Sequence, residues 1–71
     1  MNIRIGIVGK ILRGDGLGGY IKVVDDTSNT GGFLILTSAE LSMTNGFDTW
    51  VENSEALDRY FIESDWIVDW S

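Results

Sequence analysis

The sequence contains no cysteine and no histidine. Without cysteine the chain has neither disulfides nor thiol chemistry, and without both residues it lacks the usual ligands of zinc and most transition metals. Histidine is also the commonest general base at neutral pH. Acid–base chemistry is left to carboxylates, so we expect neither an enzyme nor a cofactor.

Basic residues are scarce as well, and no long hydrophobic run is present. Five Lys and Arg face eleven Asp and Glu, for a net charge of −6. This balance argues against a nucleic-acid partner, because phosphates are bound by Lys and Arg. No apolar run approaches the roughly 20 residues of a membrane-spanning helix, and charge and glycine interrupt the first residues, unlike a signal peptide. We therefore expect a cytoplasmic protein that binds neither nucleic acid nor membranes.

The length of 71 residues predicts a single domain, residues 1–71. A chain of this size buries roughly 60% of the surface that its unfolded form exposes, and its core leaves about 3–5 kcal/mol of net stability. Such a fold gains from a bound partner or from dimerisation. A homodimer therefore stays open.

The first half of the chain has the pattern of three strands joined by turns. Apolar residues alternate from Ile3 to Leu12 and predict a strand with one buried face, in which Gly6 and Gly9 mark a bulge, a bend or a close backbone approach. Two further strands are predicted at 20–24 and 33–37, the second apolar on both faces and therefore central. Short connections favour an antiparallel meander.

Residues 38–46 can be interpreted in three ways, as a helical turn, as a strand ending at an Asn45–Gly46 turn, or as a loop. Asn-Gly is a strong hairpin signal, so we favour a strand over 47–52 after it. A helix is predicted over about 54–63, with Asn53 or Ser54 as its cap. Its apolar stripe comprises Ala56, Leu57, Tyr60 and Phe61.

The segment 66–70 predicts a last strand, with Trp66, Val68 and Trp70 on one face. The expected fold is thus α+β: a small antiparallel meander of four or five strands, with one helix packed on it before the last strand.

Three patterns suggest chemistry and are better explained by structure. Gly14, Gly16 and Gly19 match a dinucleotide fingerprint, but a strand rather than a helix follows them, which favours a tight turn. The loop 25–32 is rich in oxygen ligands, but Thr37 stands where a calcium-binding EF-hand needs glutamate. Paired carboxylates can hydrolyse glycosides, yet so small a domain has little volume for a cleft. A solvated acidic face is the favoured interpretation.

The last third of the chain combines charge with aromatic residues. Residues 1–36 carry four bases and three acids, net +1, whereas residues 37–71 carry one base and eight acids, net −7. All three tryptophans, Trp50, Trp66 and Trp70, lie in the acidic half. Most of the aromatic residues are expected in the core, with at least one tryptophan half exposed at an interface.

Several segments resemble those of small bacterial immunity proteins, which are encoded beside polymorphic or contact-dependent toxins. The resemblance lies in residues 30–36 (TGGFLIL) and 47–53 (FDTWVEN), followed by Leu57, Tyr60, Phe61 and the segment 68–70 (VDW). It implies a cytoplasmic, non-catalytic protein that neutralises a toxin domain by binding it.

An acidic protein of this kind suits a partner with a basic face, because complementary charge speeds association. Aromatic residues ringed by carboxylates would form the hot spots. The candidate partner-binding residues are Trp50, Glu52, Glu55, Asp58, Glu63 and Asp65. Two alternatives stay open: a homo-oligomeric structural protein that assembles through a strand edge or an aromatic face, and a carbohydrate-binding module that uses Trp66 and Trp70.

Overall fold

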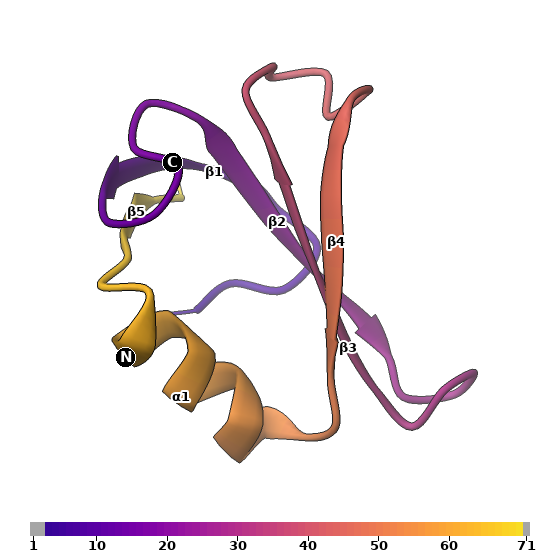
Figure 1. Ribbon diagram of the computed structural model, residues 1–71. Helices are drawn as coiled ribbons and strands as arrows, with labels where there is room; N and C mark the ends of the chain where they lie inside the picture. Colours follow the sequence, from indigo (N-terminus) through magenta and orange to yellow (C-terminus); the bar gives the residue numbers. More distant parts are fainter. Residues whose placement is uncertain (1–2, 71) are drawn as a thin grey trace.

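A computed structural model, which describes residues 3–70, has one antiparallel sheet and one helix (Figure 1). The strands pair in the order β4-β3-β2-β1-β5. This confirms the predicted α+β meander with one helix before the last strand, and the helix has the predicted bounds. The elements are β1 (Val8–Arg13), β2 (Tyr20–Asp26), β3 (Gly32–Ser38), β4 (Gly46–Val51), α1 (Ser54–Glu63) and β5 (Ile67–Asp69).

The core lies between α1 and one face of the sheet. The register of β2 and β3 pairs Val23 with Ile35 and Ile21 with Thr37, which places these side chains on the face that α1 covers. Leu57 and Phe61 are buried from the helix side. Leu34 and Leu36 point to the opposite face and are half-buried. The helix therefore covers one face, and the alternation predicted for half-buried strands holds in β2.

An aromatic cluster holds the end of α1 against β1 and β5. The Phe61 ring meets the Trp66 ring edge-on at 4.9 Å between centroids, and Trp70 stacks on Phe61 at 6.3 Å. Gly9 makes room for Trp70, because a Cβ at this position would lie 2.8 Å from Trp70 Cε3. The expectation that most aromatic residues near the C-terminus serve the core is confirmed for this cluster.

The predicted first strand is wrong in its N-terminal half. Gly6 has a φ of 79°, and this left-handed conformation turns the chain before β1 begins. Ile5 makes only an isolated bridge to Val23, and both Ile5 and Ile7 are exposed. The bend predicted at Gly6 is correct, but the alternation across it does not continue as one buried face.

Residues 39–45 form a loop, the third of the three interpretations of residues 38–46, rather than a helical turn or a strand. The Ser38 hydroxyl donates to the Asn45 carbonyl and accepts from the Glu40 N–H at 3.1 Å. These bonds close the loop between β3 and β4 and leave Gly46 as the first residue of β4. The Asn-Gly pair therefore marks the start of a strand rather than the centre of a two-residue turn.

A glycine loop, residues 14–19, joins β1 to β2 and is tied to the end of α1. The Asp15 N–H donates to Ser64 O at 3.1 Å, and Trp66 Nε1 donates to Asp15 O at 2.6 Å. Gly14 has a φ of 100°, and a Cβ there would lie 2.4 Å from Ser64 O. The predicted turn is thus confirmed, and its first glycine is required by a close approach of two backbones.

Within the described part of the chain, no helix is both long enough and apolar enough to cross a membrane.

Gly14→Ala is expected to destabilise the fold by more than about 2 kcal/mol, because it adds a backbone clash to a left-handed conformation. Gly18→Ala is the matched control: its φ is 88°, but nothing lies within 4 Å of its Cβ. Gly18→Ala should cost only the strain of that conformation, about 1–2 kcal/mol. Urea unfolding measures the free energy of unfolding of both variants. Equal losses in the two variants would contradict the close approach at Gly14.

Candidate protein-binding edge

Strand β4 forms one edge of the sheet and exposes large apolar side chains. It pairs with β3 over six consecutive residues. Phe47, opposite Thr37, lies on the face that carries α1 and is 82% exposed. Trp50, opposite Leu34, lies on the other face and is 49% exposed. Exposed apolar residues on a strand edge are typical of interaction sites.

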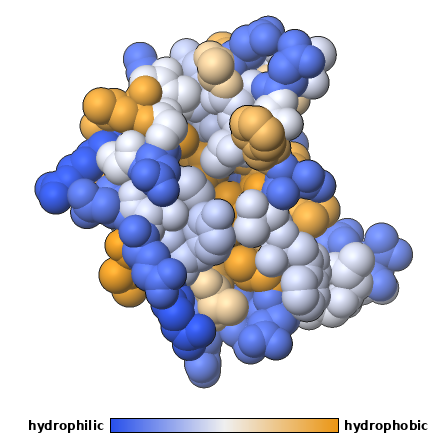
Figure 2. All heavy atoms as spheres, viewed as in Figure 1, coloured by the Kyte–Doolittle hydropathy of each residue, from blue (hydrophilic) through white to orange (hydrophobic). Residues whose placement is uncertain are grey.

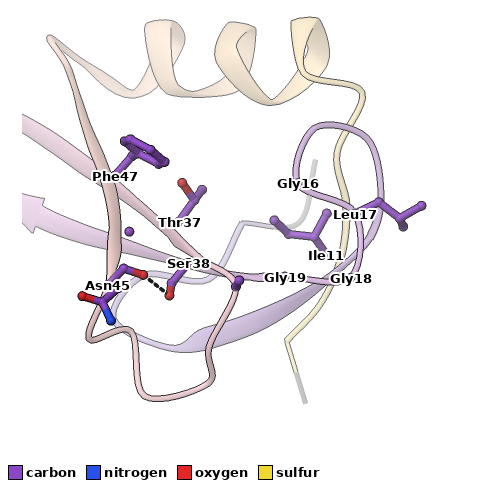
Figure 3. A pocket seen from close by; sticks show the side chains of 11 residues that line it. Ile11, Gly16, Leu17, Gly18, Gly19, Thr37, Ser38, Asn45 and Phe47 are labelled. Carbon is purple, nitrogen blue, oxygen red and sulfur yellow. Dashed lines mark hydrogen bonds between the residues drawn. The ribbon is translucent and has the colours of Figure 1, made fainter.

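Phe47 stands beside a groove on the helix side of the sheet. Two adjoining cavities, of about 680 and 300 Å³, share Gly16, Thr37 and Phe47 in their linings. The expectation that so small a domain has little volume for a cleft is therefore wrong. Figure 3 shows Phe47 and Thr37 projecting from β4 and β3 on one side, and the glycine loop with Ile11 on the other. Glycine backbone and apolar side chains make up much of the wall, so the groove suits an apolar group.

The exposed surface is patchy rather than broadly apolar. In the space-filling view, apolar side chains stand as separate patches between polar ones (Figure 2). Ile62, on the outer side of α1, is 65% exposed and is another such patch. It lies one residue beyond the predicted helical stripe. Single apolar residues on a surface are ordinary. The combination of Phe47, Trp50 and an unpaired strand edge is therefore a stronger indication of an interaction site than Ile62.

Trp50 serves the fold as well as the surface. Its Nε1 donates to Thr30 Oγ1 at 2.9 Å, and a Cβ on Gly32 would lie 2.6 Å from the same nitrogen. The indole thus fastens the loop between β2 and β3 to β4. The expectation of one half-exposed tryptophan is confirmed here. Trp66 is buried instead, which removes the paired platform on which the carbohydrate-binding alternative depended.

The structure divides the predicted acidic residues into two groups. Glu52 and Glu55 are exposed on either side of Asn53, which caps α1 by accepting from the Ala56 N–H at 2.8 Å. With Trp50 they lie at the junction of β4 and α1. Asp58 lies further along the exposed side of the helix.

Glu63 and Asp65 belong to the opposite end of α1, near β1. Asp65 accepts from Arg13 Nε at 2.8 Å, and both side chains are largely exposed. Such surface ion pairs contribute about 0–1 kcal/mol. Of the predicted set, Trp50, Glu52 and Glu55 are the members that lie in β4 or within a few residues of its end.

Sequence reasoning did not select Phe47 for the site and counted it among the aromatic residues expected mainly in the core. The β-strand pattern of 47–52 does not reveal that this strand lies at a sheet edge. Asp48, which follows Phe47 and faces the other side of the sheet, was also left out of the predicted set.

The stretch of sequence that contains β4 has charge of a single sign. Residues 23–58 contain seven acidic residues and no basic one. This stretch includes β3, β4 and the first half of α1. Four of the five bases precede it, in β1, β2 and the N-terminal segment. The β4 edge therefore belongs to the acidic part of the sequence, and negative charge of this kind attracts basic partners.

The loop 25–32 satisfies its own carboxylates. Asp25 accepts from Thr27 Oγ1 at 2.6 Å and from the Thr27 N–H at 2.9 Å, and these bonds hold the pKa of Asp25 below its usual value. Asp26 accepts from Thr30 Oγ1 at 2.9 Å. The described residues contain no group of three or more potential metal ligands. The loop is thus a polar turn closed by its own hydrogen bonds.

Comparison of the chain with protein-family models, with curated proteins and with solved structures finds no match. The candidate site is therefore defined by its geometry and charge.

Phe47→Ala is expected to leave the free energy of unfolding within about 0.5 kcal/mol of the parent chain, because an exposed side chain loses little on truncation. Phe61 is the matched control, since it is the same residue type at 2% exposure. Phe61→Ala should cost about 3–5 kcal/mol and largely unfold the domain. Thermal and urea unfolding compare the two. A large loss in Phe47→Ala would assign this residue to the fold instead of the surface.

Proposed function

We propose that the chain is a small acidic protein-binding module of the immunity type, which acts in the cytoplasm and neutralises a toxin domain by binding it directly. The observation that carries this proposal is the exposure of Phe47 on an edge strand within a stretch of seven acids and no base. Covering such a side chain is favourable at about 25 cal/mol per Å². In its exposed position, Phe47 contributes little to the stability of the fold.

The chemistry of the site suits a basic partner. A toxin that acts on nucleic acid has a basic face for phosphates, and an acidic protein can occupy that face and exclude the substrate. The carboxylates of Asp48, Glu52 and Glu55 would steer the encounter. Phe47 and Trp50 would then provide the apolar centre of the contact, as aromatic residues do in most hot spots.

The test is whether the neighbouring reading frame encodes a toxin domain and whether that domain binds the chain, measured as a stable complex and as rescue of growth on co-expression. The double variant Asp48→Asn, Glu52→Gln should slow association about tenfold at low salt, because it removes two steering charges. Raising the salt concentration should reduce the difference.

Glu63→Gln is the matched control, because it removes one exposed acid at the far end of α1. Its association rate should stay within about twofold of the parent. Absence of a complex at any salt concentration would reject the proposal. An equal loss of association rate in the double variant and in Glu63→Gln would reject the β4 edge as the binding site for the toxin domain.

A homo-oligomeric structural protein is the second candidate. It is favoured by the half-buried Val24, Leu34 and Leu36 on the face of the sheet away from α1. Sedimentation at high protein concentration separates the two candidates, and a monomer there removes this one.

A further inference from the structure

The two edges of the sheet differ in their capacity to accept another strand. Strand β5 has three residues, and its register with β1 shifts between Ile11 and Arg13. Strand β4 has six residues in continuous register with β3. A regular edge of this length presents a row of backbone donors and acceptors. Of the two, β4 is therefore the one suited to pair with another chain.

Strand β4 also lacks the usual protection of an edge. Natural edges are blocked by lysine, proline, bulges or a covering segment. Residues 46–51 contain no lysine, arginine or proline, and the pairing with β3 shows no bulge. The one charged side chain in this strand is Asp48. An edge with a negative side chain repels other acidic strands but still accepts a basic one.

The two faces of β4 require different side chains from an added strand. On the helix side, Phe47 adjoins the groove formed with Thr37 and the glycine loop. On the other side lie Asp48 and Trp50. Side chains of a strand alternate between faces. The complementary segment therefore has apolar residues toward Phe47 and basic residues toward Asp48.

A second copy of the chain fits this edge poorly. Two β4 strands paired about a two-fold axis would bring together two stretches that each carry seven acids and no base. Like charges on adjacent strands are destabilising. Charge complementarity thus selects a basic segment of another protein as the occupant.

We infer that the partner binds by strand addition: an extended segment that alternates basic and apolar residues pairs with β4 and extends the sheet, with its apolar side chains against Phe47 and the groove. This inference rests on the proposed function and specifies the binding mode of the same site.

The experiment uses the full chain, labelled with ¹⁵N, and a synthetic peptide of alternating lysine and valine about as long as β4. Binding should be saturable, and amide hydrogen exchange should slow about tenfold or more in alternate residues of 46–51, because strand addition protects every second N–H. A peptide of alternating glutamate and valine should not bind. A lysine–valine peptide interrupted by proline should lose the protection, since proline removes the backbone donors.

Asp48→Lys should weaken binding of the lysine–valine peptide about tenfold, since an attraction becomes a repulsion. Glu63→Lys makes the same charge change at the far end of α1 and should leave the affinity within about threefold of the parent. The inference is wrong if the amides that respond lie on the outer side of α1, if the proline peptide binds equally well, or if β4 becomes protected by raising the protein concentration without peptide.

The same exchange measurement on the complex with the toxin domain separates the inference from the proposed function. A stable complex with unprotected β4 amides would overturn strand addition and leave the function standing. Peptide pairing at β4 without any toxin complex would support the strand-accepting edge and remove the toxin as its partner.

Discussion

The structure depends on the contact between the glycine loop and the end of α1. Asp15 donates its N–H to Ser64 and accepts from the Trp66 indole, and so joins positions about fifty residues apart. Gly14 permits the approach because it carries no Cβ. In a domain whose net stability is about 3–5 kcal/mol, two hydrogen bonds of about 1 kcal/mol each are a large share. They also hold the glycine loop in place as one wall of the groove.

The aromatic residues have different roles at the two edges of the sheet. Trp66 and Trp70, which flank β5, both pack against Phe61 of α1. Phe47 and Trp50 lie on the far edge, where no helix covers them. Trp50 is retained partly by its bond to Thr30. Phe47 has no such bond, so the packing of the fold does not account for an aromatic residue at this position.

Sequence reasoning succeeded where the determinants are local. The bounds of α1 follow from the Asn53 cap and an apolar stripe, which act within one turn. It failed in continuing one buried strand face across Gly6, and it left residues 38–46 undecided; a left-handed glycine and a Ser38–Asn45 bond redirect the chain at these two places. The position of β4 at an edge depends on the order of all five strands. Neither the exposure of Phe47 nor the pairing of Asp65 with Arg13 can be derived from neighbouring residues.

The acidity of the β4 region has a consequence for the edge itself. An unprotected edge strand is an aggregation hazard in any protein, and lysine is the common remedy. Here the surrounding charge is negative, so two copies repel each other while a basic segment is attracted. In the proposed binding mode, the charge that discourages self-association is also the charge that would select a basic partner. An edge protected by lysine would be equally soluble but would repel such a partner, so the proposal gives a physical reason for carboxylates beside an open strand.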